Sequence, residues 1–410
     1  MFKRISIAPT LLKLIPMAML FACGELDEPD MPIDEYGEVE TIEFKGAKNR
    51  AVVLRSTPFV NGESGYDTYR TPSIVKAANG DILAFAGARD AHGDNSRANV
   101  VLRRSKDSGR TWEPMQTIAG RAKNMKDRNG LPSAVTLEDG TIILLYMWSK
   151  FVTNEDDRGC RRMYMKTSKD NGVTWSSRVN ITRQTQKPCR EDASGKIRDT
   201  IADGHWGWTG LGPVHGIVKR YPPNQRRIIF GARHKAPDGK SYAHIIYSDD
   251  GGDHWEIGGS LGIKSSEATV VELPNGEIML NARSTGSSTN RIVGLSRDGG
   301  ESFYSTVEDK NLIEPGCQGS LLRYGNSILF SNPFNTEGKK NGTIQRSTDN
   351  GATWVTKRTY LGPEYFSGYS DMVRKDGHIG ILVEWGSQSG VRQPHEEIRY
   401  IVVRKKALGL

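Results

Sequence analysis

The stretch Ser105-Lys-Asp-Ser-Gly-Arg-Thr-Trp112 decides the fold, because its pattern S-x-D-x-G-x-T-W recurs along the chain. The copies start at residues 105, 168, 248, 296 and 347, so neighbouring copies are 48 to 80 residues apart. The third copy has His254 in place of Thr, and the fourth has Ser302-Phe303 in place of Thr-Trp. Asp and Ser side chains bond nearby backbone N–H groups and Gly allows a positive φ, so each copy predicts a tight turn.

Each copy stands in a hairpin pattern. An apolar, β-branched run precedes it, as in Asn99-Val-Val-Leu-Arg103 before the first copy. The aromatic residue that ends the phrase is expected to pack as an apolar plug against a neighbouring hairpin. Repeats of about 40–50 residues are typical of propeller blades, and longer intervals would hold insertions. Five marked turns and one unmarked blade predict an all-β, six-bladed β-propeller without a long helical segment.

The first 22 residues have the pattern of a targeting segment. A basic start is followed by the short apolar core Leu14–Ala22, which is too short to span a membrane as a stable anchor. The phrase Leu20-Phe-Ala-Cys23-Gly24 resembles a bacterial lipobox, which implies cleavage before Cys23 and lipidation of its thiol. A plain secretory signal with an incidental Cys is the alternative.

These features divide the chain into three predicted parts. They are a lipoprotein signal peptide (1–22), a flexible Asp-, Glu- and Pro-rich tether from Cys23 (23–46), and a catalytic propeller domain (47–410). We expect an exported lipoprotein of the outer membrane, on the cell surface or the periplasmic face. It would touch the membrane only through its lipid.

Charge and cysteine content narrow the class of ligand and the compartment. The formal net charge of +8 includes three positive charges of the signal peptide, so the mature chain has only a modest bias toward acidic ligands. A dense Lys/Arg run and a nucleic-acid motif are both missing from the sequence, which argues against nucleic-acid binding.

In an exported protein Cys160 could pair with Cys189, while Cys317 stands in an apolar context and is expected to be a buried thiol. The sequence has no metal-ligand spacing, phosphate loop or nucleophilic Ser phrase, so we expect neither a metal nor another cofactor.

Local phrases from residue 50 to residue 404 resemble the bacterial exo-α-sialidases (neuraminidases) of glycoside hydrolase family 33. The repeated turn is the Asp-box of these propellers. Tyr69-Arg70-Thr-Pro72 is similar to the family's Arg-Ile-Pro phrase, and a second Arg, Arg89, ends the following strand. The stretch from Glu267 to Arg283 resembles the family's strand pair with a catalytic Glu and a carboxylate-binding Arg. Glu272, offset by five residues, would face the other side of the pleat and is expected to be structural.

The resemblance implies three catalytic residues. Tyr369, followed by Ser370-Asp371, matches the phrase that carries the nucleophile; Tyr365 is its rival but lacks that context. Glu267 would be the base that activates the tyrosine. Asp94, in the loop after the second Arg, would be the acid/base, with Asp90 of the same loop as its competitor.

The resemblance also implies the residues that bind substrate. Arg70 and Arg283 would hold the carboxylate of sialic acid, and Arg89 would line the pocket. Trp148 would contact the acetamido methyl, with ordinary packing as the alternative. Lys339 stands where the family has a third Arg. A lysine is a point charge that cannot make the planar two-pronged contact of a guanidinium, so this departure puts the usual substrate in question.

The residue types agree with the chemistry of sialosides. Sialic acid carries a carboxylate on its anomeric carbon, which would repel a carboxylate nucleophile, whereas a neutral tyrosine avoids this repulsion. Since a tyrosine has a pKa of about 10, it needs a neighbouring base. The sequence predicts a retaining exo-α-sialidase that acts on sialylated glycans or glycoproteins. The alternatives are an enzyme for a related 2-keto acid sugar, a trans-sialidase, and a non-catalytic glycan-binding propeller.

Overall fold

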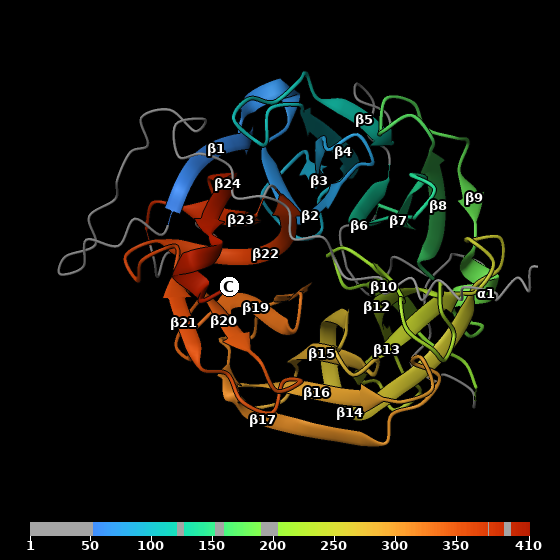
Figure 1. The fold of residues 1–410 in the computed structure, drawn as a ribbon. Helices are drawn as coiled ribbons and strands as arrows, with labels where there is room; N and C mark the ends of the chain where they lie inside the picture. The colour runs from blue at the N-terminus through green and yellow to red at the C-terminus, as the bar shows by residue number, and fades with distance from the viewer. Residues whose placement is uncertain (1–51, 121–126, 152–159, 190–203, 376, 389–394) are drawn as a thin grey trace, which may run out of the picture.

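The computed structural model describes residues 52–120, 127–151, 160–189, 204–375, 377–388 and 395–410 (Figure 1). The predicted signal peptide, the tether and the lipidated Cys23 lie outside these residues. Within the described part of the chain, no helix has the length and apolar character needed to cross a membrane.

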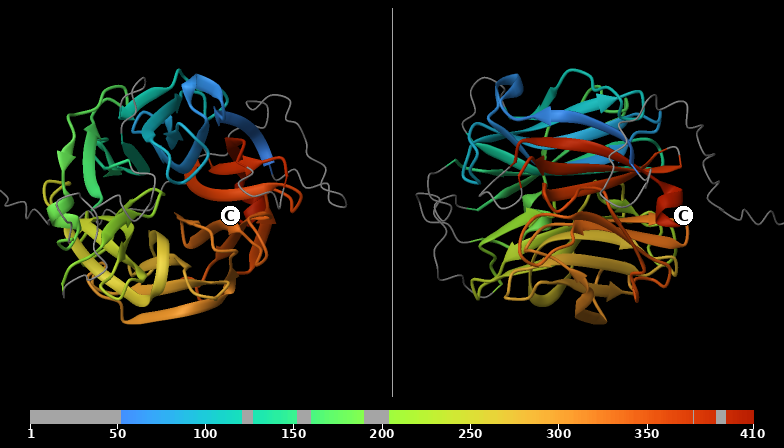
Figure 2. Two further views of the ribbon diagram at one scale, coloured as in Figure 1. Left: turned by 180° about the vertical axis from the view of Figure 1, so that it is seen from behind. Right: turned by 90° about the vertical axis from the view of Figure 1, so that its left-hand side faces the viewer.

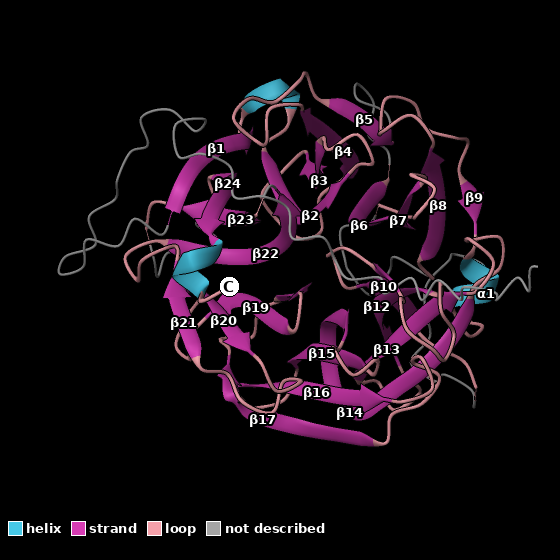
Figure 3. Cartoon of the chain, in the orientation of Figure 1, coloured by secondary structure: helices cyan, strands magenta, loops and turns pink. Residues whose placement is uncertain are grey.

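The described residues form a β protein in which consecutive strands pair in antiparallel sets (Figure 3). The first set holds β2 (Thr68–Lys76), β3 (Ile82–Arg89), β4 (Ala98–Ser105) and β5 (Gln116–Ala119). The second holds β6 (Arg128–Thr136), β7 (Ile142–Ser149), β8 (Arg162–Ser168) and β9 (Val179–Asn180). The third holds β10 (Trp208–Leu211), β11 (Ile217–Val218), β12 (Ile228–Lys235), β13 (Ser241–Ser248) and the first half of β14 (Glu256–Glu272).

The remaining sets continue around the molecule. The fourth holds the second half of β14 with β15 (Ile278–Ser284), β16 (Asn290–Ser296) and β17 (Ser305–Ile313). The fifth holds β18 (Ser320–Tyr324), β19 (Ser327–Pro333), β20 (Gly342–Ser347) and β21 (Thr356–Thr359). The sixth holds β22 (Phe366–Lys375), β23 (His378–Gly386), β24 (Glu397–Arg404) and β1 (Val52–Val60). The short helices are η2 (Glu63–Gly65), α1 (Thr182–Thr185) and η4 (Lys405–Leu408).

The first strand of the described chain completes the sheet formed by its last strands. β1 pairs antiparallel with β24, where Val52 lies opposite Val403 and Val60 lies opposite Glu397. In Figures 1 and 2 the sets follow one another as a ring, and the blue β1 lies beside the red β24. The prediction of an all-β, propeller-like chain without a long helix is therefore confirmed for the described residues.

The repeated turns have the predicted geometry. In the first, Ser105 Oγ donates to Asp107 Oδ1 (2.7 Å), and the backbone N–H groups of Gly109 and Thr111 donate to Ser105 Oγ (2.7 Å) and Asp107 Oδ1 (2.9 Å). Gly109 has a φ of 90°, and a Cβ there would lie 2.1 Å from the Tyr400 ring. Glycine is thus required at this position both by its backbone angle and by the close approach of Tyr400.

The two incomplete copies keep the same contacts with other side chains. In the third copy, His254 Nδ1 lies 2.6 Å from Asp250 Oδ2, where a threonine hydroxyl stands in the complete copies. In the fourth, Ser302 Oγ donates to Asp298 Oδ2. Because each substitute offers a donor to the turn Asp, the loss of the consensus residue leaves the turn intact.

The possible disulfide between Cys160 and Cys189 is present, with the two Cα atoms 6.1 Å apart. Cys317 is a buried free thiol, as predicted. Burial raises the pKa of Cys317 to about 11, so its sulfur is held as the neutral thiol at neutral pH.

One buried carboxylate connects four strand sets at the centre of the molecule. Asp371 Oδ2 accepts hydrogen bonds from the backbone N–H of Ile74 (2.9 Å) and of His215 (2.8 Å). Asp371 Oδ1 accepts from Ser320 Oγ (2.9 Å) and lies 2.7 Å from His215 Nδ1. These partners belong to the first, third and fifth sets, and Asp371 itself belongs to the sixth.

We predict that Asp371→Asn lowers the free energy of unfolding by about 3–5 kcal/mol, because it removes one charge of a buried pair with His215 and reduces the acceptor capacity for the other donors. Urea denaturation followed by tryptophan fluorescence measures this. Asp253→Asn is the matched control, since Asp253 is exposed on a turn. Equal stability of the two variants would contradict a central role for Asp371.

Candidate active site

Irregular points in three innermost strands position the predicted site residues. The pairing register shifts at Arg70–Ser73 in β2, Ser265–Ala268 in β14 and Ser367–Ser370 in β22. A bulge bends its strand and re-aims the local side chains. At these points the side chains of Arg70, Glu267 and Tyr369 come together from sets that are far apart in sequence.

Tyr369 and Glu267 form a buried hydrogen-bonded pair, in which Tyr369 Oη donates to Glu267 Oε1 over 2.8 Å. Arg233 Nη1 lies 2.9 Å from Glu267 Oε1, and Arg283 Nη1 lies 3.2 Å from Glu267 Oε2. Burial opposes ionisation of Glu267, but the two guanidinium groups outweigh it and lower the pKa of that carboxyl well below its usual range. Burial and the Glu267 charge raise the pKa of Tyr369 well above 10. The resting pair is therefore a neutral phenol beside a carboxylate that can accept its proton.

A second buried carboxylate fixes Arg70. Arg70 Nε donates to Glu384 Oε1 over 2.8 Å, and the same oxygen accepts from the Thr71 backbone N–H at 2.8 Å. Glu384 Oε2 accepts from the Tyr369 backbone N–H at 3.2 Å. Burial would raise the pKa of Glu384, but the attraction of Arg70 prevails and lowers it to about 2. Glu384 thus favours the ionised form and joins Arg70 to the backbone of Tyr369.

Asp94 lies at the exposed edge of this cluster. Its side chain is 68% exposed, accepts a hydrogen bond from Arg89 Nη1 at 2.8 Å and lies 4.0 Å from Arg70 Nη1. Asp90 instead accepts from Arg97 Nη1 at 3.2 Å. Of the two competing acids, Asp94 is thus the one that faces the predicted arginines. Partial burial would raise the pKa of Asp94, but Arg89 and Arg70 lower it well below its usual range.

Lys339 reaches the cluster from the fifth set. Its Nζ lies 5.5 Å from the centroid of the Tyr369 ring, and Arg70 Cζ lies 6.0 Å from the same centroid. Arg346, the nearest arginine in sequence, donates instead to Ser327 Oγ at 3.0 Å within its strand set. Lys339, and not Arg346, is therefore the residue of this stretch that lies beside the Tyr369 ring.

Two other aromatic residues were considered from the sequence, Trp148 and Tyr365. Trp148 stands near the end of β7, opposite Asn129 and Arg162 of the adjacent strands, and is half-buried. Its contact with the acetamido methyl stays a prediction. Tyr365 packs against Trp385, with ring centroids 5.8 Å apart, so its ring is held in aromatic packing.

The sequence analysis missed two residues of the cluster, Arg233 and Glu384. Arg233 lies near the end of β12, and Glu384 lies near the end of β23. Arg89 and Arg283 stand in the same way near the ends of β3 and β15. A repeated dipeptide marks three of these ends: Ala88-Arg89, Ala232-Arg233 and Ala282-Arg283. Comparing equivalent strand ends between repeats would have indicated Arg233, whereas Glu384 has no such signal.

Comparisons with known proteins identify relatives of this chain. Residues 80–381 match the family described as "BNR repeat-like domain". A sialidase of Micromonospora viridifaciens is 31% identical over 83% of this chain and 53% of its own length. A sialidase of Bacteroides fragilis is 27% identical over 79% of this chain and 61% of its own length. The chain thus spans between about half and two thirds of these two curated relatives.

A solved structure shares the fold. The Hadza microbial sialidase Hz136 superposes with a TM-score of 0.72 at 24% sequence identity, over 87% of this chain and 69% of that chain. At this identity the likeness supports the architecture of the ring and its strand order.

We predict that Arg89→Gln raises the pKa of the Asp94 carboxyl by about 1–3 units, because it removes the nearest cation. Carboxyl ¹³C NMR titration of aspartate-labelled protein measures the shift, with Asp94→Asn to assign the signal. Arg97→Gln is the matched control, since Arg97 pairs with Asp90. An Asp94 titration that is the same in wild type and Arg89→Gln would show that Arg89 does not set this pKa.

Proposed function

The chain belongs to the family of BNR repeat-like domains, and from this premise we propose that it is a retaining exo-α-sialidase acting on terminal sialic acid of glycoconjugates. The observation that carries the proposal is the buried Tyr369–Glu267 hydrogen bond in the midst of Arg70, Arg283 and Lys339. We further interpret the strand sets as the blades of a six-bladed propeller. Each set has its innermost strand toward one axis, and β1 closes the sixth set.

The cations would select an anionic sugar. Arg70, Arg283 and Lys339 come from the first, fourth and fifth sets and surround the nucleophile, so a carboxylate at the anomeric carbon would lie between them. Arg283 lies 3.2 Å from Glu267 in the free protein, and a bound carboxylate would share this guanidinium. The phenol of Tyr369 is neutral, so it approaches such a substrate without charge repulsion.

The first half of the proposed reaction forms a covalent intermediate. Tyr369 Oη attacks the anomeric carbon while Glu267 accepts the phenolic proton, and Asp94 gives a proton to the departing glycosidic oxygen. The bond from the anomeric carbon to the leaving oxygen breaks as the bond to Oη forms. In the second half, Asp94 takes a proton from water, whose oxygen attacks the same carbon. The bond from this carbon to Oη breaks, and the departing Tyr369 oxygen recovers its proton from Glu267. Two displacements at one carbon give retention.

The acid role of Asp94 requires a change in its environment. In the free protein Arg89 and Arg70 keep Asp94 ionised. A substrate carboxylate on Arg70 would offset part of that positive charge, and a bound sugar would cover the exposed Asp94 side chain. Both effects raise a carboxyl pKa, so substrate binding itself would prepare Asp94 to carry the proton that it donates.

Lys339 motivates a second candidate within the same chemistry. Because its ammonium binds a carboxylate less directionally than a guanidinium, the site would accept a related 2-keto acid sugar or a sugar acceptor in place of water. Product analysis with N-acetylneuraminate and deaminated neuraminate glycosides, with and without an acceptor sugar, separates these activities. A purely glycan-binding role is disfavoured by the hydrogen-bonded Tyr369–Glu267 pair.

We predict that wild-type protein releases free sialic acid from α2,3- or α2,6-sialyllactose, and that Tyr369→Phe lowers kcat/KM by about 10³-fold because the nucleophilic oxygen is lost. Tyr365→Phe is the control for losing a tyrosine hydroxyl elsewhere and should behave as wild type. Equal release by Tyr369→Phe and wild type would refute the nucleophile. No release by any of the three proteins would refute the proposed substrate.

We predict that Lys339→Arg lowers the KM for sialyllactose about tenfold, because a guanidinium adds a second parallel hydrogen bond to the carboxylate. Steady-state kinetics of released sialic acid measures this. Lys340→Arg is the control, since its Nζ lies 3.3 Å from Glu337 outside the cluster. A Lys339→Arg variant that binds sialyllactose more weakly would show that the site is shaped for the smaller ammonium.

We also propose that Cys23 is the lipid-anchored first residue of the mature protein, on the basis of the lipobox-like phrase. Metabolic labelling with a palmitate analogue should modify the wild type, while Cys23→Ser should lose the label and leave the membrane fraction. Unchanged membrane association of Cys23→Ser would refute the anchor.

A further inference from the structure

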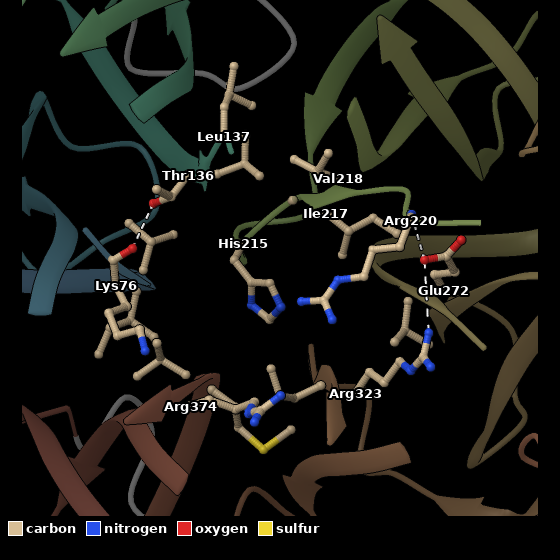
Figure 4. A pocket seen from close by; sticks show the side chains of 18 of the residues that line it. Lys76, Thr136, Leu137, His215, Ile217, Val218, Arg220, Glu272, Arg323 and Arg374 are labelled. Atoms are coloured by element: carbon tan, nitrogen blue, oxygen red, sulfur yellow. Dashed lines mark hydrogen bonds and ion pairs between the residues drawn. The ribbon is translucent and has the colours of Figure 1, made fainter. Parts of the chain in front are cut away.

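A separate cavity lies on the axis where the innermost strands end (Figure 4). Its volume is about 510 Å³, and residues from β2, β6, β11, β14, β18 and β22 all line it. A volume of this size falls within the range of about 300–1,000 Å³ that is usual for small-molecule sites.

The cavity is distinct from the catalytic cluster. On β2, Arg70 of the catalytic cluster lies near the start of the strand, and Lys76 of the cavity is its last residue. On β22, Tyr369 of the catalytic cluster likewise precedes Arg374 of the cavity. At about 3.3 Å per residue, five or six residues of strand separate the two places by roughly 15–20 Å. The same strands therefore carry the catalytic cluster toward one end of the axis and the cavity toward the other.

Basic side chains outnumber acidic ones in the lining. Four different sets contribute a cation each, and the lining cations are Lys76, Arg220, Arg323 and Arg374. The lining carboxylates are those of Glu138 and Glu272. Each of them has a basic partner outside the lining: Glu272 lies 3.0 Å from the buried Lys219 Nζ, and Glu138 lies 3.3 Å from Arg226 Nε. The lining as a whole is thus electropositive.

Three of the lining groups carry N–H donors. His215 has Nδ1 engaged by Asp371 at 2.7 Å, and Figure 4 shows its imidazole and the Arg220 guanidinium directed into the space between the strands. Arg323 Nη1 is buried, has no hydrogen-bond partner among the described residues, and is 4.0 Å from Glu272 Oε2. An oxyanion bound nearby would satisfy such donors.

The rest of the wall is apolar. It includes Val135, Leu137, Ile217, Val271, Leu322 and Met372. An apolar wall with a few convergent polar groups is the usual composition of a site for a small organic ligand, because the wall supplies binding energy and the polar groups fix orientation. The ligand that fits this lining has a compact carbon body and an oxyanion.

We propose that this axial cavity binds a small organic phosphate or sulfate ester, with Arg220, Arg374 and His215 as donors to the oxyanion. The site is independent of sialoside cleavage. A tetrahedral oxyanion, with up to two negative charges in a phosphate monoester and one in a sulfate ester, can accept hydrogen bonds from several sides at once, which matches donors that enter from the third and sixth sets.

The test is isothermal titration of the mature protein with glucose 6-phosphate and, separately, glucose 6-sulfate, at an ionic strength held constant with potassium chloride. These two arms distinguish a phosphate from a sulfate ligand. The double variant Arg220→Ala/Arg374→Ala should bind the preferred ester at least tenfold more weakly than wild type. Arg297→Ala is the control for losing an exposed arginine, since Arg297 pairs with Glu277 on the surface.

Lys339→Ala separates the cavity from the catalytic cluster, which is also cationic, and should keep wild-type affinity for the ester. Loss of binding in Lys339→Ala alone would place the ester in the catalytic cluster and overturn the proposal, and so would the absence of saturable binding to wild type. If the double variant does not fold, the single variants Arg220→Gln and Arg374→Gln make the same comparison. Sialic acid release by the cavity variants reports separately on the proposed function.

Discussion

The buried carboxylate of Asp371 is the contact on which the centre of this molecule depends. It accepts hydrogen bonds from Ile74, His215 and Ser320, and so connects the first, third and fifth sets to the sixth. Burial lowers the pKa of His215, but attraction by Asp371 raises it by more, so the imidazole bound to this carboxylate favours the protonated form. Tyr369 stands two residues earlier on β22, so the contact that connects the sets also holds the backbone next to the proposed nucleophile.

The catalytic cluster places buried charges in mutually supporting pairs. Glu384 holds Arg70, and Glu267 lies between Arg233 and Arg283. Leaving any one of these groups buried without its partner would be costly, since an uncompensated buried charge destabilises a fold strongly. The pairs keep both carboxylates ionised while they leave an excess of positive charge near Tyr369. A substrate that brings its own carboxylate fits such an excess, whereas a neutral sugar would leave it unbalanced.

The innermost strands explain why one ring of strand sets can form two chemically different sites, the catalytic cluster and the axial cavity. Innermost strands such as β2, β14 and β22 carry reactive groups at their bulges and line an electropositive cavity at their ends. The Asp371–His215 pair links the two regions, because Asp371 is two residues from Tyr369 on β22 and His215 lines the cavity.

The sequence by itself determined the local chemistry. The repeated S-x-D-x-G-x-T-W phrase was enough to predict the turns and the all-β class, because each turn is stabilised by side chains within four residues of one another. Local phrases also singled out Tyr369, Glu267 and Arg283. The tertiary structure alone showed that Asp94 contacts Arg89 while Asp90 contacts Arg97, and it placed Arg233 beside Glu267 and Glu384 beside Arg70. The physical reason is distance along the chain: Arg70 and Glu384 are 314 residues apart, and Glu267 and Tyr369 are 102 apart. Residues so far apart in the sequence meet only when the ring of strand sets closes, and no local pattern of residues encodes this closure.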